Sequence, residues 1–212
     1  MRSADRALFF ASGDKRVSSD GRACGSCHID GRDDGLVWSS PDGPRQTALL
    51  AGRVGNGPFG WRAESATLEE HVSESIKRLK GTGLPPEDVS ALAAYVRSLP
   101  APPQVAIADD LKVARGRAIF NTPEASCASC HDPKRAFSDG STHDVSSRAS
   151  ADKFTDFRTP SLARIGQSAP YFHDGRYATL QELLRKSDGS MGATRHLHDD
   201  DLAALEAYLR TL

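Results

Sequence analysis

The chain has 212 residues, of which 38% are hydrophobic and only 7% aromatic, and its formal net charge is -1. The length allows one large domain or two small ones, and the aromatic content is lean for two cores. A charge near zero gives no argument for binding nucleic acid or an anionic membrane surface. No apolar run approaches the roughly 18 residues of a membrane span. We therefore expect no nucleic-acid partner and no transmembrane segment.

The chain begins with MRSADRALFFASGDKR, in which residues 5–11 predict a short amphipathic helix. This stretch contains neither a long apolar run nor a small-residue cleavage site, so it does not read as a signal peptide. The sequence fits a cytosolic protein, or a mature form from which an export signal has been removed.

All four cysteines lie in two copies of one pattern, CGSCH at 24–28 and CASCH at 127–131. A shared zinc site would normally keep its pairs about 15–20 residues apart, and a redox-active pair does not need the following histidine. Covalent attachment of haem c explains the whole pattern, because both thiols form thioethers and the histidine binds iron. We therefore predict four thioether anchors and two proximal ligands: Cys24, Cys27, Cys127 and Cys130, with His28 and His131.

Two covalently bound haems would also explain the lean aromatic content, because each is a large apolar body that fills the centre of a core. Haem attachment to cysteines takes place outside the bacterial cytoplasm. We therefore expect the protein to be periplasmic or secreted, with its export signal removed.

The segments that follow the two motifs repeat each other. Residues 43–72 and 156–184 align on a shared ATL, and each copy closes with a predicted helix, at 86–99 and 199–212. A helix is also expected at 114–121, before the second motif.

A proline-rich linker, PAPPQ, separates the copies. We predict two domains, at 1–103 and 104–212. The second copy carries a polar, serine-rich insertion at 138–155, which we expect to be a surface loop.

The chain resembles the bacterial di-haem cytochrome c peroxidases and the related di-haem enzymes that mature tryptophan tryptophylquinone. The resemblance rests on the two CxxCH sites, on GPRQTALL and RTPSL after them, on PYFHDG, and on the C-terminal SMGATRHLHDDDLAALEAYLRTL. In that family the C-terminal haem receives electrons from a donor protein and the N-terminal haem reduces hydrogen peroxide. The resemblance implies an all-α protein of two cytochrome-c-like haem domains packed together, derived from an internal repeat.

The resemblance also assigns axial ligands. Met191 matches the methionine that commonly completes the C-terminal haem, and a thioether ligand raises the reduction potential. Trp61 matches a tryptophan thought to help electrons pass between the haems, although plain core packing explains it as well. His71 matches a glutamine on the peroxide-binding face of the N-terminal haem. It would bind iron, act as an acid–base group on peroxide, or be a solvated histidine.

Further residues follow from the same comparison. Arg45 and Arg158 would pair with haem propionates. Family members often hold calcium between their domains, and Gln46, Ser168 and Pro170 match that site with altered side chains.

Two classes of function stay open. The first is an electron-transfer cytochrome that receives electrons from a small donor protein, a c-type cytochrome or a cupredoxin, at the C-terminal haem. The second is a cytochrome c peroxidase-like enzyme that reduces hydrogen peroxide at the N-terminal haem. The glutamate that peroxidases carry after the distal glutamine has no clear match here, because Glu74 stands at a different spacing.

Overall fold

The computed structural model describes residues 3–55, 57–146 and 148–212. The chain divides into two compact units, described separately below: unit 1 is Met1–Asp34 with Thr47–Ala101, and unit 2 is Gly35–Gln46 with Pro102–Leu212. A hairpin that directly follows the first cysteine motif therefore belongs to the unit that carries the second motif. The division at residue 103 stays a prediction.

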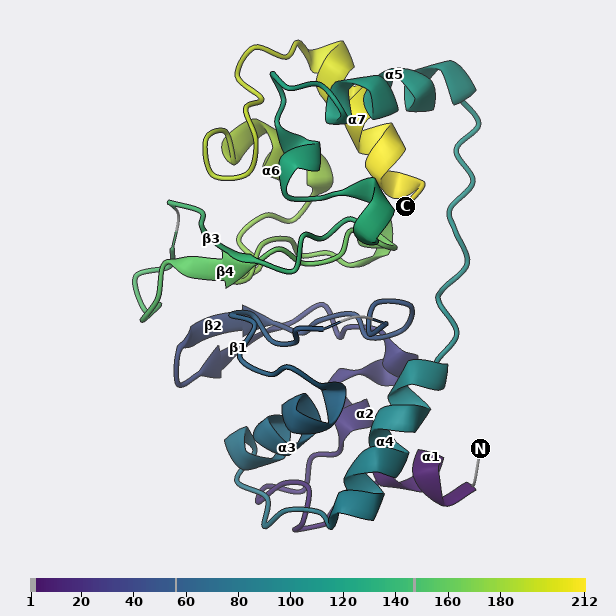
Figure 1. Ribbon diagram of the computed structural model, residues 1–212, viewed down its shortest axis with the longest axis vertical. Helices are drawn as coiled ribbons and strands as arrows, with labels where there is room; N and C mark the ends of the chain where they lie inside the picture. Colours follow the sequence, from purple (N-terminus) through teal and green to yellow (C-terminus); the bar gives the residue numbers. More distant parts are fainter. Residues whose placement is uncertain (1–2, 56, 147) are drawn as a thin grey trace. The chain divides into compact units, whose positions relative to one another are not determined.

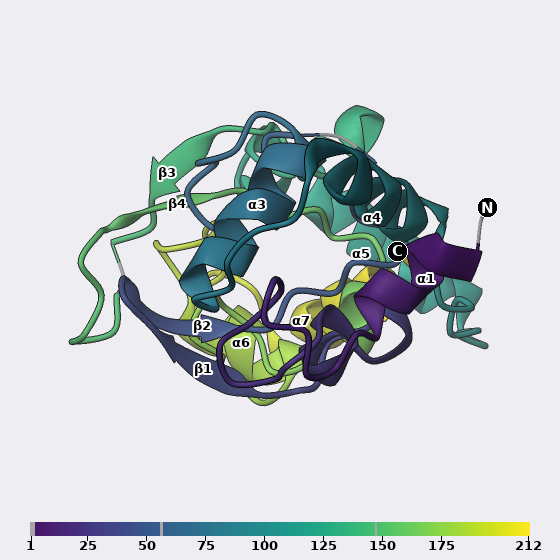
Figure 2. The same ribbon diagram turned by 90° about the horizontal axis from the view of Figure 1, so that it is seen from below.

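Unit 1 is built around helix α4, which packs against α1 and α3 (Figures 1 and 2). A proline at the first position of α4 and a threonine cap before α3 start these helices. The core contains Phe9, Phe59 and Leu92. The helices of this unit are α1 (Ser3–Phe9), α2 (Cys24–Cys27), α3 (Leu68–Arg78) and α4 (Pro86–Ser98).

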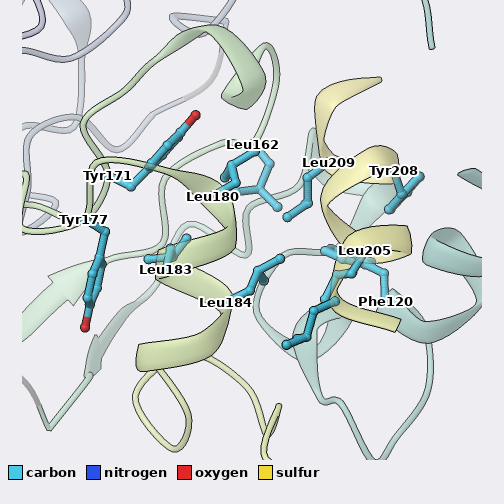
Figure 3. Packing of buried hydrophobic residues seen from close by; sticks show 11 residues of the cluster. Phe120, Leu162, Tyr171, Tyr177, Leu180, Leu183, Leu184, Leu205, Tyr208 and Leu209 are labelled. Atoms are coloured by element: carbon cyan, nitrogen blue, oxygen red, sulfur yellow. The ribbon is translucent and has the colours of Figure 1, made fainter. Parts of the chain in front are cut away.

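Unit 2 has its core between three helices, in which α7 packs against α5 and α6. Figure 3 shows Leu180 and Leu184 of α6 on the side that faces Leu205 and Leu209 of α7. The helices of this unit are α5 (Asp110–Phe120), α6 (Leu180–Lys186) and α7 (Asp199–Arg210). The helices predicted at 86–99 and 199–212 are thus confirmed as α4 and α7.

The prediction of an all-α protein is wrong. Helices account for 36% of the chain and strands for 10%, and the strands form two antiparallel hairpins (Figure 1). Long extended segments follow each cysteine motif, where glycine, proline and serine interrupt the helical pattern. The strands pair as β1 (Val37–Ser40) with β2 (Gly43–Gln46), and β3 (Thr142–Asp144) with β4 (Asp156–Arg158).

Both units share one local arrangement before α3 and α6. An isolated antiparallel bridge joins Phe59 to Ser65 in unit 1 and Tyr171 to Tyr177 in unit 2. A threonine then caps each helix, and the glutamate three residues further on accepts from backbone N–H groups ahead of the helix. The two segments that align in sequence therefore adopt the same backbone turn.

In the described ranges, no helix combines the length and apolar character that crossing a membrane requires.

Gly116 marks the closest approach of α5 to α7. A Cβ at this position would overlap the carbonyl of Ala204 and come within 2.8 Å of Tyr208 Cβ. Replacing a helical glycine by alanine normally stabilises by up to about 1 kcal/mol. Here we expect Gly116→Ala to destabilise the protein by about 1–3 kcal/mol, because the helices must move apart. Thermal unfolding measures this, and Gly55→Ala, where nothing lies within 4 Å, is the control.

Candidate functional site

The first cysteine motif folds as a single helical turn. The backbone N–H of His28 donates to the carbonyl of Cys24 over 2.9 Å. The hydroxyl of Ser26 accepts from the N–H of Ala23 over 3.0 Å and closes the start of the turn. The turn lies against the core of unit 1, on which Cys24 packs. Both thiols and the imidazole therefore stand in one short, supported segment.

The second motif repeats this geometry with a 3₁₀ turn at Cys127–Ser129, where the N–H of His131 donates to the carbonyl of Cys127 over 3.0 Å. In the side chain, Nδ1 of His131 lies 3.0 Å from the carbonyl oxygen of Phe137. A carbonyl can only accept, so Nδ1 carries the hydrogen and Nε2 keeps its lone pair. Metal-bound histidines are held in this way, and His131 is therefore oriented to bind iron through Nε2.

In both motifs, burial disfavours the charged forms of the cysteine and histidine side chains. It raises the pKa of the thiols of Cys24 and Cys127 to about 11, and it lowers the pKa of His28 and His131. The imidazoles are therefore neutral, the form that binds a metal ion, and all four cysteines are free. With the fixed tautomer of His131, these residues fit covalently attached haem.

Met191 lies beside the second motif. It packs against the same core cluster as Cys127 and Phe137, and its N–H donates to the carbonyl of Ser187 over 3.0 Å. The next residue, Gly192, is close enough to the motif that a Cβ there would lie 3.3 Å from Sγ of Cys127. The structure thus brings the predicted methionine ligand and the second CxxCH together in unit 2.

His71 is half-buried on α3 in unit 1. Its ring stacks on Phe59 with centroids 6.4 Å apart, and Phe59 belongs to the core cluster on which Cys24 packs. Nδ1 of His71 lies 3.4 Å from the hydroxyl of Ser65. His71 is therefore not a fully solvated histidine, and its roles as an iron ligand or an acid–base group stay predictions.

Trp61 and Arg158 are both half-buried. Trp61 lies in the turn that the Phe59–Ser65 bridge closes, and Arg158 ends β4 opposite Thr142. Their roles in electron passage and in propionate binding stay predictions.

Arg45 forms a buried cluster within unit 2. Its Nη1 donates to Asp152 Oδ1 over 2.5 Å, and His173 Nε2 lies 2.8 Å from Asp152 Oδ2. The ring of Phe157 stacks on His173 at 3.7 Å and lies beneath the Arg45 guanidinium. Arg45 thus has a carboxylate partner inside the protein, which fastens β2 to the rest of the unit. Sequence reasoning missed Asp152, which is buried within the segment expected to be a surface loop.

Two of the residues matched to the calcium site lie together in unit 2. Gln46 and Ser168 are both buried, and the Gln46 side-chain nitrogen donates to the carbonyl of Ser168 over 3.1 Å. Because calcium binds oxygen atoms, this contact gives calcium no support.

One group of metal-ligating side chains was not expected from the sequence. Cys130, Asp139 and His143 offer ligand atoms within 4.8 Å of one another, and His143 Nε2 lies 2.6 Å from Asp139 Oδ2. Cys130 is a predicted thioether anchor, so its sulfur would be taken up by haem, and the histidine–carboxylate pair lies next to this predicted attachment point.

Two CxxCH turns, each followed by a bridge, a capped helix and a packed core, define a di-haem c-type protein. Residues 112–211 match the family model described as di-haem cytochrome c peroxidase. The chain is 30% identical to the methylamine utilization protein MauG of Methylorubrum extorquens over 84% of this chain and 66% of that protein. It is 28% identical to hydrazine synthase subunit gamma of Kuenenia stuttgartiensis over 90% of this chain and 72% of the subunit.

Solved structures agree on the fold. Kuenenia stuttgartiensis hydrazine synthase matches with a TM-score of 0.82 at 24% identity, covering 100% of this chain and 88% of the other. A MauG-like protein associated with microbial copper homeostasis matches with a TM-score of 0.75 at 22% identity, covering 98% and 86%. The chain belongs to the di-haem cytochrome c peroxidase family, which includes MauG.

Proposed function

We propose that this protein is a periplasmic di-haem cytochrome that carries electrons from a small donor protein, through the haem of unit 2, to the haem of unit 1. The haems would supply iron that cycles between its ferric and ferrous forms. The four cysteines would anchor them, and His28 and His131 would each present a neutral imidazole to iron.

The entry point is assigned to unit 2 because of Met191. A thioether favours ferrous iron and raises the potential of a His/Met haem. The packing of Met191 in the cluster that contains Cys127 supports this ligand pair. Unit 1 has no such residue, because Met1 is the only other methionine in the chain.

The engagement of all three glutamates on α3 is the observation that favours electron transfer over peroxidase chemistry. Glu69 pairs with Arg97 at 2.6 Å, Glu70 accepts from the N–H of Ala66 at 2.8 Å, and Glu74 pairs with Lys77 at 2.6 Å. Each carboxylate is thus paired with a cation or with a backbone N–H group. His71 brings an imidazole to α3, and we assign it as the sixth ligand of the His28 iron.

His71→Ala should convert the ferric spectrum of the unit 1 haem from low-spin to high-spin, because it removes the proposed sixth ligand. Electron paramagnetic resonance and absorption spectra of the haem-loaded protein measure this. Glu74→Ala, on the exposed side of the same helix, should leave both haem spectra unchanged. A His71→Ala spectrum identical to that of the wild type would contradict the ligand assignment.

The alternative function is peroxide reduction at the unit 1 haem, with His71 as an acid–base group. Turnover of hydrogen peroxide with a reduced donor cytochrome separates the two functions. An electron carrier closed by His71 should show no steady turnover. Sustained turnover by the wild type that is lost in His71→Ala would establish the peroxidase instead.

A further inference from the structure

A buried serine hydroxyl lies beside His71. Ser65 is 1% exposed, and its Oγ lies 3.4 Å from His71 Nδ1. A hydroxyl removed from water is costly without a hydrogen-bond partner. At 3.4 Å the contact is at the long end for a hydrogen bond, so its geometry depends on how firmly both residues are held.

The backbone holds both residues. The N–H of Phe59 donates to the carbonyl of Ser65 over 2.8 Å, and the N–H of Ser65 donates back over 3.2 Å. His71 lies in the first turn of α3, where its N–H donates to the carbonyl of Thr67 over 3.1 Å. Phe59, in the core of unit 1, stacks on the His71 ring with an angle of 28° between the planes. The hydroxyl and the imidazole are therefore supported by adjoining elements of one turn.

The chemistry of the pair decides which ring nitrogen is free. When Nδ1–H donates to the serine oxygen, Nε2 keeps its lone pair and can bind iron. His131 shows the same division, because its Nδ1–H donates to the carbonyl of Phe137. Ser65 would thus fix the tautomer of His71, as the carbonyl of Phe137 fixes that of His131.

The equivalent turn of unit 2 has no such pair. Tyr177 takes the bridge position of Ser65, and Leu183 takes the helix position of His71, both buried in the apolar core. The polar pair occurs in the unit that lacks a methionine ligand, while in unit 2 Met191 packs against the core. The pair is therefore a property of one haem site and is not required by the shared turn.

We propose that Ser65 is a positioning residue that accepts the Nδ1 hydrogen of His71 and so directs Nε2 toward the iron of unit 1. This inference rests on the proposed ligand role of His71. Loss of hydrogen-bond partners around metal ligands typically weakens metal binding 10- to 100-fold. Without Ser65, His71 should therefore compete less well for the sixth position.

Azide titration of the ferric, haem-loaded protein tests this competition, because azide must displace His71 from the unit 1 iron. Ser65→Ala should lower the apparent Kd for azide by 10- to 100-fold, toward the value of His71→Ala. Ser65→Thr and Ser65→Val form a matched pair, because both enlarge the side chain and only threonine keeps the hydroxyl. Ser65→Thr should retain the wild-type affinity for azide, and Ser65→Val should bind azide as tightly as Ser65→Ala does. Ser73→Ala is the helix control, since the Ser73 hydroxyl bonds the carbonyl of Glu69 over 3.0 Å.

The outcomes separate the two proposals. If His71→Ala changes azide affinity but Ser65→Ala and Ser65→Val do not, the role of Ser65 is wrong and the ligand role of His71 stands. If Ser65→Thr and Ser65→Val lower the apparent Kd for azide equally, the effect is one of packing and not of the hydroxyl. The inference is then also overturned. If His71→Ala itself leaves the unit 1 haem unchanged, the proposed function fails at its ligand.

Discussion

Replacing Asp152 with asparagine should lower the free energy of unfolding by about 3–5 kcal/mol, the range for breaking a buried ion pair by removing one partner. The Asp152 side chain is 0% exposed and that of Arg45 only 9%. Besides Arg45 and His173, the backbone N–H of Ala149 donates to this carboxylate over 2.6 Å. The substitution keeps the volume of the side chain but leaves a buried guanidinium without its negative partner. Chemical denaturation followed by circular dichroism, at equal haem content, measures the difference.

An exposed ion pair provides the control for this change. Glu74 and Lys77 lie 2.6 Å apart, with side chains 49% and 70% exposed. Exposed pairs contribute about 0–1 kcal/mol, so Glu74→Gln should change stability little. If Asp152→Asn and Glu74→Gln lowered the free energy of unfolding by similar amounts, burial would not make the Arg45–Asp152 pair more stabilising than an exposed pair.

The same carboxylate should respond to pH. Burial acts to raise the pKa of Asp152, but hydrogen bonds from Arg45, His173 and the N–H of Ala149 outweigh it and hold the pKa below its ordinary 3.8. As the pH falls, the unfolded chain therefore takes up this proton before the folded one does. The stabilisation is fully present above about pH 4 and is lost as the pH falls through the lowered pKa. The stability gap between wild type and Asp152→Asn should accordingly narrow in acid.

The residues proposed to bind haem could be picked out from the sequence because their signal is local. Five consecutive residues identify each CxxCH motif, and the structure adds the contacts around it, such as that of His131 with Phe137. The cap of α3 is equally local, since Thr67 and Glu70 stand at capping-box spacing.

The Arg45 cluster could not be predicted in the same way. Arg45 and Asp152 are 107 residues apart in the chain, and nothing near Asp152 distinguishes it from the other polar residues of the segment 138–155. The hairpin that carries Arg45 did have a readable signal. Ser40-Pro41-Asp42-Gly43 places proline and glycine where a type I turn prefers them, and the all-α prediction overlooked it.

Ser65 had no signal of its own. A serine in a polar turn is ordinary, and its burial arises only when the bridge to Phe59 folds it against α3. Ser65 stands out only when the two units are compared, because Tyr177 occupies the same position in the turn of unit 2.

Met191→Leu should lower the reduction potential of the unit 2 haem by on the order of 100 mV or more, within the about 0.8 V that axial ligands span. Leucine retains the apolar volume that packs against the core cluster, so the stability should fall by less than about 1.5 kcal/mol. The thioether sulfur is lost. Spectroelectrochemical titration of the two haems measures the potential, and the sulfur-to-iron charge-transfer absorption of the ferric form should disappear at the same time.

A volume-conserving exchange in the same cluster separates ligation from packing. Leu197 packs on this cluster as Met191 does, and Leu197→Met should leave the potential and spectrum of the unit 2 haem unchanged. If Met191→Leu shifted the potential no more than Leu197→Met, the methionine would be a core residue. The assignment of electron entry to unit 2 would then lose its physical basis, because a thioether ligand is what sets the higher potential expected of an entry site.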